Sequence, residues 1–221
     1  SRAHRSLLEA ENALRLQSTK YPDGWGIGWF VEDDAYVIKS ATPAHASERF
    51  RKASSRLISQ TFIVHVRNAT VGALDHLNAH PFRFGRWLFA HNGTVFGYET
   101  IQDWVAERID IDLMPLILGD TDSEAIFFYI LSCLKRDGID PSGRSAASAT
   151  DIAVVTRGAL LALDNEAKQR GLKRPILNSL ITDGRSFVAH RAGMPLFLST
   201  QRTSCSDERN CAEPNKFCLQ P

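Results

Sequence analysis

The sequence predicts an α+β fold built on antiparallel sheets. Predicted strand pairs come first, predicted helices follow, and another strand pair comes near the end. Runs of one element type, in place of strict alternation, favour α+β packing over a parallel sheet. The composition, with 43% hydrophobic and 23% charged residues, is that of a globular protein with one sizeable core.

Strands are predicted where β-branched and aromatic residues cluster between turn residues. Residues 25–31 follow a Pro-Asp-Gly turn and interleave glycines with large apolar residues, so another backbone or a ligand is expected to approach closely. Residues 61–67 alternate, which places His65 and Arg67 on the face opposite Phe62. The predicted strands are 25–31, 35–39, 61–67, 87–91, the hairpin pair 176–182 and 187–191, and 194–199.

Helices are predicted from apolar residues that recur on one face and from start signals. Thr121 and Glu124 have the Thr-x-x-Glu spacing of a capping box, which predicts that a helix begins there. The predicted helices are 1–16, 44–57, 98–107, 125–135 and 150–170.

Charge and hydropathy exclude several classes of protein. Lys and Arg number 26 against 25 Asp and Glu, for a net charge of +1 with no basic block, so neither nucleic acid nor a membrane surface is an expected partner. No apolar run reaches the roughly 18 residues of a membrane span, and a cytoplasmic protein is expected. Without repeats or a linker, residues 1–221 are expected to form a single domain, truncated at both ends, with an irregular tail over 200–221.

The four cysteines do not suggest a metal site. Cys133 lies in an apolar helical pattern and is expected to be a buried thiol. Cys205, Cys211 and Cys218 are separated by gaps of five and six residues, whereas paired zinc ligands usually lie two to four residues apart. Loop thiols are the simpler interpretation, and no function is assigned to them.

Three polar positions lie at the ends of predicted elements, where a rigid element holds a side chain open to substrate. Arg67 follows a strand, Asn92-Gly93 ends another, and Asp122 opens a helix. Each has a structural alternative: an ion-pair arginine, a hairpin turn and a helix-dipole carboxylate. Together they supply a fork for a carboxylate, a partner for an ammonium and two donors for an amide oxyanion. Glutamine carries all three groups.

Histidines offer a competing interpretation. His65, His76, His80 and His91 contain enough ligands for a metallohydrolase site, with His76 and His80 one helical turn apart. Pro81 and the unpatterned sequence before it argue against a helix there. We therefore expect no metal and no other cofactor.

Five short motifs occur in order within residues 20–190: DGWGI at 23–27, HVRNAT at 65–70, HPF at 80–82, HNG at 91–93 and GDTDSE at 119–124. On these motifs the sequence resembles the class II (N-terminal nucleophile, purF-type) glutamine amidotransferases. Asn68 stands where larger synthases of the family carry Trp, and Val71 where they carry His. These differences favour the small stand-alone subfamily.

The resemblance implies an αββα sandwich of the Ntn-hydrolase type, with two antiparallel sheets between helical layers. It implies that Arg67 holds the glutamine α-carboxylate, that Asn92 and Gly93 form the oxyanion hole, and that Asp122 contacts the amino-acid end. Thr70 is placed beside that end. The implied reaction is hydrolysis of glutamine or a γ-glutamyl amide through a γ-glutamyl thioester, with a synthase as the partner that receives ammonia.

The nucleophile departs from the family pattern. The family uses an N-terminal cysteine, but the first cysteine of this sequence is Cys133, and Ser1 opens a predicted helix where a strand is needed. We expect the strand with the nucleophile to lie upstream of Ser1, and we expect these 221 residues alone to hydrolyse glutamine negligibly. Two alternatives stay open: an inactive module that binds a glutamine-like ligand, and a γ-glutamyl-metabolite hydrolase.

Overall fold

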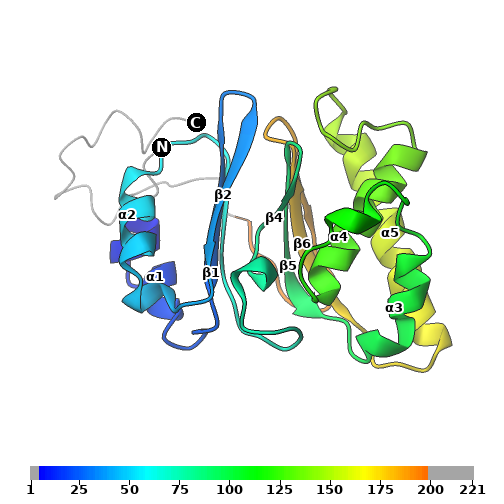
Figure 1. The fold of residues 1–221 in the computed structure, drawn as a ribbon, viewed down its shortest axis with the longest axis horizontal. Coiled ribbons are helices and arrows are strands. Elements are labelled where there is room, and N and C mark those ends of the chain that lie inside the picture. Colours follow the sequence, from blue (N-terminus) through cyan, green and yellow to red (C-terminus); the bar gives the residue numbers. More distant parts are fainter. Residues whose placement is uncertain (1–4, 199–221) are drawn as a thin grey trace.

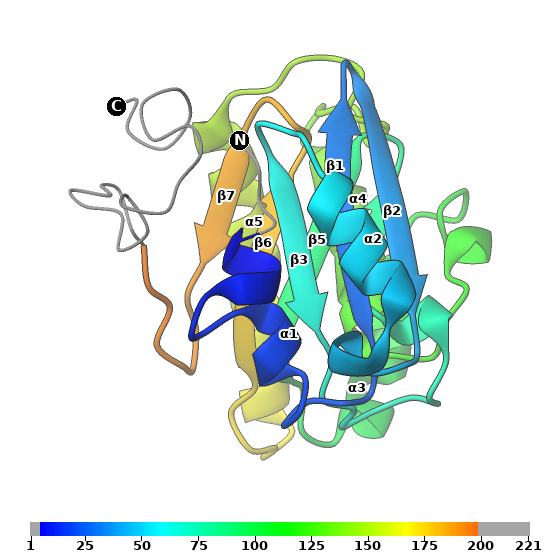
Figure 2. The ribbon, with the colours of Figure 1, turned by 90° about the vertical axis from the view of Figure 1, so that its left-hand side faces the viewer.

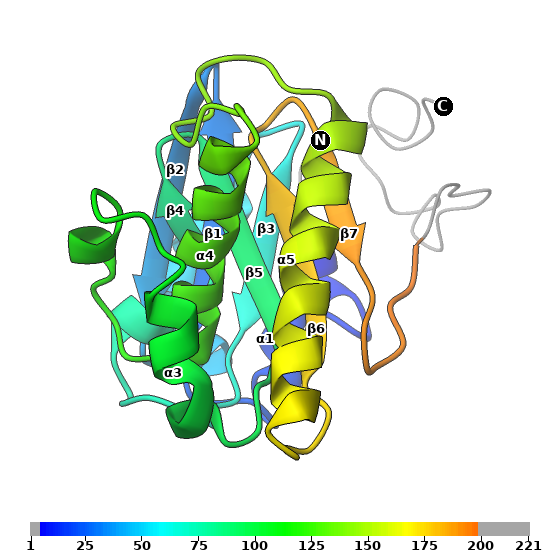
Figure 3. The same cartoon turned by 90° about the vertical axis from the view of Figure 1, so that its right-hand side faces the viewer.

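A computed structural model of the protein describes residues 5–198 and has four layers (Figure 1). Two antiparallel sheets face each other in the middle, and helices cover the outer face of each. Figure 2 shows α1 (Leu14–Gln17) and α2 (Glu48–Arg56) over the first sheet. Figure 3 shows α3 (Tyr98–Ala106), α4 (Asp122–Arg136) and α5 (Ala149–Gln169) over the second. The expected αββα sandwich is confirmed.

The first sheet has the strand order β2-β1-β3. Its strands are β1 (Trp25–Val31), β2 (Asp34–Ser40) and β3 (Phe62–Val66). The central strand pairs antiparallel with both neighbours, so that Ile27 lies opposite Ile38 of β2 and Val64 of β3. The strands predicted at 25–31, 35–39 and 61–67 are confirmed.

The second sheet has the order β4-β5-β6-β7. Its strands are β4 (Phe82–Phe84), β5 (Trp87–Thr94), β6 (Ile176–Thr182) and β7 (Phe187–His190). The strand predicted at 87–91 continues to Thr94, because Asn92 and Gly93 pair with β6 instead of forming a hairpin turn. The sequence did not predict β4, whose three residues are too short to show a pattern. The hairpin of β6 and β7 is confirmed.

Three predicted elements are wrong in part. The described part of the predicted helix 1–16 is a π-helical turn, Arg5–Glu9, followed by α1. The helix predicted at 44–57 is interrupted at Ser47, whose backbone is extended and whose hydroxyl caps α2 by accepting from the Phe50 N–H. Residues 194–198 form no strand, and the side-chain amide of Asn178 donates to the Met194 carbonyl there. The remaining short turns of helix are Ala44–Ala46, His76–Asn78 and Met114–Leu116.

The helix that begins at the predicted capping box is α4. The Thr121 hydroxyl accepts from the Glu124 N–H, as the motif predicts. The Glu124 carboxylate, however, accepts from the Gly119 N–H at 2.6 Å instead of returning to the cap residue. The motif therefore fixes the preceding loop as well as the start of α4.

Apolar packing is strongest outside the space between the sheets. The largest core lies between the second sheet and α3, α4 and α5, and a smaller one lies between the first sheet and α1 and α2. Only a small cluster, which includes Phe30, Ile63 and Leu88, joins the two sheets directly. Beside this cluster the two sheets enclose a cavity, which both polar and apolar side chains line.

Glycine allows the chain to approach β1 closely on this inner side. A Cβ atom on Gly26 would lie 2.0 Å from the His80 carbonyl oxygen, and one on Gly28 would lie 2.6 Å from Pro81 Cγ. The close approach expected from the glycines of 25–31 is confirmed, and it carries His80 into the inter-sheet space. Within residues 5–198, no helix combines the length and apolarity that crossing a membrane would require.

Candidate functional site

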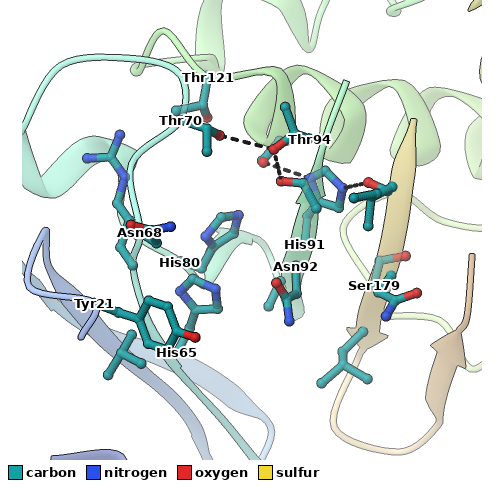
Figure 4. Close-up of a pocket in the computed structure, with 18 of the residues that line it drawn as sticks. Tyr21, His65, Asn68, Thr70, His80, His91, Asn92, Thr94, Thr121 and Ser179 are labelled. Carbon is teal, nitrogen blue, oxygen red and sulfur yellow. Dashed lines mark hydrogen bonds between the residues drawn. The ribbon is translucent and has the colours of Figure 1, made fainter. Parts of the chain in front are cut away.

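A cavity of about 580 Å³ lies between the two sheets (Figure 4). Residues of β3, β5 and β6, the start of α4 and the loop after β3 line it. The five site residues predicted from the sequence all lie on its wall: Arg67, Thr70, Asn92, Gly93 and Asp122. They come from three separate segments of the chain, so the fold brings together what the sequence keeps apart.

Arg67 directly follows β3 and is only 3% exposed. Its Nη1 donates to the Ala73 carbonyl and its Nη2 to the Val71 carbonyl, both at 2.9 Å. The loop after β3 therefore wraps around the guanidinium and holds it in place. Burial lowers the pKa of Arg67, and Asp23 opposes this effect, yet a guanidinium keeps its charge in proteins. The described residues provide no acceptor for its Nε–H or for its second Nη1–H.

Asn92 and Gly93 lie in β5 opposite Asn178 and Leu177 of β6. The Asn92 side chain is exposed toward the cavity (Figure 4). A Cβ atom at position 93 would lie 1.8 Å from the Ile176 carbonyl oxygen, so only glycine fits against β6 there. The Asn-Gly pair is therefore held by sheet pairing, which fixes its orientation more firmly than a loop would.

Asp122 is the first residue of α4 and is 4% exposed. Its Oδ2 accepts from the Val95 N–H at 2.8 Å, and its Oδ1 accepts from the Ser123 hydroxyl at 3.0 Å. Nearby, the exposed Thr70 hydroxyl lies 3.1 Å from Thr94 Oγ1, which bridges the loop after β3 to β5. The helix start, the strand and the loop thus meet at one end of the cavity.

The cavity also holds three histidines that the sequence offered as candidate metal ligands: His65, His80 and His91. The His65 and His80 rings lie 4.5 Å apart, centroid to centroid, and neither His80 ring nitrogen has a hydrogen-bond partner. Two signals could have found them: the alternation that places His65 on the face of Arg67, and the His-Pro step. His76 instead lies outside, with a 61% exposed side chain beside Asp75. Over residues 5–198, no three His, Cys, Asp or Glu side chains are arranged to hold a metal ion.

Burial lowers the pKa of all three histidines. It lowers the pKa of His65 to about 4, aided by His91 and Arg67. It lowers the pKa of His80 well below the usual value, and the neighbouring His65 adds to the effect. For His91 burial also lowers the pKa, although Asp122 opposes it.

The stability of the folded protein is therefore expected to depend on pH. Between pH 6.5, where an unfolded histidine takes up a proton, and about pH 4, where folded His65 does, the unfolded state binds more protons. The free energy of unfolding should fall as the pH drops through this window. The His65→Gln variant should show a shallower fall, measured by urea denaturation at a series of pH values.

The matched control is His76→Gln, at the exposed histidine beside Asp75. It should leave the pH dependence of the wild-type protein unchanged. An equally steep fall in His65→Gln would show that His65 takes up its proton normally in the folded state.

The chain is similar to proteins of one known family. Residues 11–204 match the family model of the class-II glutamine amidotransferases, which is most of the chain. The chain belongs to this family. As a class-II glutamine amidotransferase it resembles the Saccharomyces cerevisiae protein named "Probable glutamine amidotransferase DUG3", with 27% identity over 184 residues, 76% of this chain and 51% of that protein. The chain thus spans about half the length of that relative.

Two further relatives extend the comparison. The γ-glutamyl-hercynylcysteine sulfoxide hydrolase of Mycobacterium tuberculosis (strain CDC 1551 / Oshkosh) is 39% identical over 99 residues, 40% of this chain and 42% of that one. The structure of a glutamine aminotransferase class-II domain protein from Silicibacter pomeroyi superposes with a TM-score of 0.60 at 24% identity, over 79% of this chain and 71% of that one. The structural likeness confirms the fold.

The family's nucleophile is a cysteine, and none lines the cavity in the part of this amidotransferase chain that the structure describes. Cys133 lies in α4, partly buried, and accepts from Arg136 Nη2 at 3.0 Å. Cys205, Cys211, Cys218 and Ser1 lie outside the described residues.

Proposed function

We propose that the cavity binds glutamine or another γ-glutamyl amide and that the protein hydrolyses its amide bond. One observation carries this proposal: a buried arginine, a buried aspartate and an Asn-Gly pair from three chain segments line a single cavity. These are the partners that an α-carboxylate, an α-ammonium and an amide oxyanion require. Membership of the class-II glutamine amidotransferases supports it.

In this proposal each residue acts on one end of the substrate. The free N–H groups of Arg67 bind the α-carboxylate, while Asp122 and Thr70 bind the ammonium end. This leaves the amide toward Asn92 and Gly93, whose donors stabilise the oxyanion when the carbonyl is attacked. We propose the family's cysteine thiolate as the nucleophile: ammonia leaves, a γ-glutamyl thioester forms, and water releases glutamate.

The proposed reaction has two candidates for its substrate and for the fate of the ammonia. In the first candidate the ammonia passes to a synthase partner, and membership of the class-II glutamine amidotransferases supports it. Hydrolysis of a larger γ-glutamyl metabolite is the second candidate, favoured by the mycobacterial relative. A second cavity of about 520 Å³ adjoins the first and shares Thr70, Val71 and Thr94 with it, which gives room for a larger substituent.

The test is an assay of the protein as the cell makes it. With glutamine it should release ammonia and glutamate in equal amounts, and added hydroxylamine should trap the thioester as a γ-glutamyl hydroxamate. The 221-residue chain, which has no cysteine before Cys133, should release almost none. Failure of the cellular protein to cleave any γ-glutamyl amide would leave a binding module in place of an enzyme.

A further inference from the structure

A chain of hydrogen-bonding groups links His91 to Asp122 along the wall of the cavity. His91 Nε2 lies 2.8 Å from the Ile176 carbonyl oxygen, and His91 Nδ1 lies 2.8 Å from Ser123 Oγ. Ser123 Oγ in turn lies 3.0 Å from Asp122 Oδ1. All three side chains are at most 5% exposed, so water does not compete for these contacts.

A neutral histidine and an ionised aspartate do not supply enough hydrogens for all the contacts of this chain. A carbonyl oxygen only accepts, so His91 Nε2 must carry a hydrogen for the contact with Ile176. The Ser123 hydroxyl has one hydrogen, which it can give either to His91 Nδ1 or to Asp122, but not to both. With a neutral histidine and an ionised aspartate, one of the two contacts would join two acceptors. One additional proton satisfies every contact, either on His91 Nδ1 or on the Asp122 carboxyl.

We propose that the His91–Ser123–Asp122 network holds this additional proton in the free protein and releases it when an ammonium group binds at Asp122. The second half rests on the proposed function, which places the substrate ammonium there. The balance is simple: the ammonium keeps its three hydrogens, the network loses one, and the buffer receives it. His91 and Ser123 are thus positioning residues that set the charge of Asp122.

The additional proton has two possible positions, His91 and Asp122. Burial lowers the pKa of His91, which disfavours an imidazolium, while Asp122 opposes this effect. At the other end of the network, Asp122 Oδ2 accepts from the Val95 N–H. Because Ser123 Oγ contacts both His91 Nδ1 and Asp122 Oδ1, the proton belongs to the network.

The other titratable groups around the network do not supply this proton. Burial lowers the pKa of His65 on β3 and of His80 before β4, so both are neutral at pH 7. Burial and Asp122 raise the pKa of Tyr98 in α3, which keeps its hydroxyl protonated. Arg67 is the permanent cation on the cavity wall, and Lys39, whose pKa burial lowers to about 8, faces His80 from β2.

The test is an NMR measurement on the 221-residue chain at pH 7. The ¹⁵N shifts of the His91 ring and the ¹³Cγ shift of Asp122 report where protons reside. The expected result is either an imidazolium or a protonated carboxyl, with Nε2 protonated in both cases. A neutral His91 beside an ionised Asp122 would overturn the proposal.

Three variants isolate the network. Ser123→Ala removes the central hydroxyl and should give a neutral His91 and an ionised Asp122. Ser123→Thr keeps a hydroxyl and should retain the wild-type shifts. Ser55→Ala, at an exposed serine on α2 that donates to the Lys52 carbonyl, should change neither. Wild-type shifts in Ser123→Ala would contradict a proton shared through Ser123.

A ligand titration in the same samples tests the release. High concentrations of glutamine should shift the amide signals of residues 92 and 93 and move Asp122 to the ionised form. Glutaramate lacks the ammonium and should leave the network proton in place. Shifted amides with an unchanged Asp122 would overturn the release while the substrate site stands. Unshifted amide signals would contradict the proposed substrate site and, with it, the release of the proton. The spectrum of the protein without ligand would still decide whether the network holds the proton.

Discussion

Replacing Asn92 by alanine is expected to lower kcat for glutamine hydrolysis by about 100- to 1,000-fold in the protein as the cell makes it. The amide N–H₂ at this position is one of two donors proposed for the oxyanion, and the charge it stabilises develops only in the transition state. KM should therefore change much less than kcat. The Asn92 side chain is exposed toward the cavity, so its loss should leave the fold intact.

The control for Asn92→Ala is Asn165→Ala, at an exposed asparagine on α5. It should keep the wild-type kcat. Circular dichroism and urea denaturation of both variants would separate a catalytic effect from unfolding. A kcat for Asn92→Ala equal to that of the wild type would remove the oxyanion role.

Replacing Arg67 by lysine should raise KM for glutamine by about 10- to 100-fold, since a hydrogen bond to a charged group contributes about 1.5–3 kcal/mol. Lysine keeps the positive charge but cannot present two N–H groups in one plane to a carboxylate. It also cannot reach both the Val71 and the Ala73 carbonyls in the way that Arg67 does. The loop after β3 should loosen, and some stability should be lost as well.

Arg83→Lys is a matched control for this loss of a backbone contact. Arg83 also donates to a carbonyl, that of Ala35 at 3.0 Å, but it does not line the cavity. Its replacement should leave KM unchanged. An Arg67→Lys variant with the wild-type KM would show that the carboxylate binds elsewhere.

The sequence predicted much of the site because local patterns set its geometry. Alternation in 61–67 placed His65 and Arg67 on one face, and the structure turns that face toward the cavity. The start signal at Thr121 placed Asp122 at the head of a buried helix. Long strands and helices were predicted for the same reason, since their patterns repeat over many residues.

What the sequence did not predict depends on contacts between distant segments. Asn92 and Gly93 form part of a strand because β6, more than 80 residues later, pairs with them. The proton chain that links His91 to Asp122 exists only because β6 carries the Ile176 carbonyl to His91. Similarly, the hydrogen bonds from Arg67 to the Val71 and Ala73 carbonyls depend on the conformation of a loop whose sequence has no regular pattern. Tertiary structure decides all three.

The proposed function requires that one cavity bind the α-carboxylate of a γ-glutamyl amide at Arg67 and its α-ammonium at Asp122. It is tested most directly by measuring kcat/KM of the wild type and Arg67→Lys with glutamine and with 4-aminobutanamide, which lacks the carboxylate. The loss of kcat/KM caused by Arg67→Lys should be large with glutamine and nearly absent with 4-aminobutanamide. An equal loss with both substrates would contradict it.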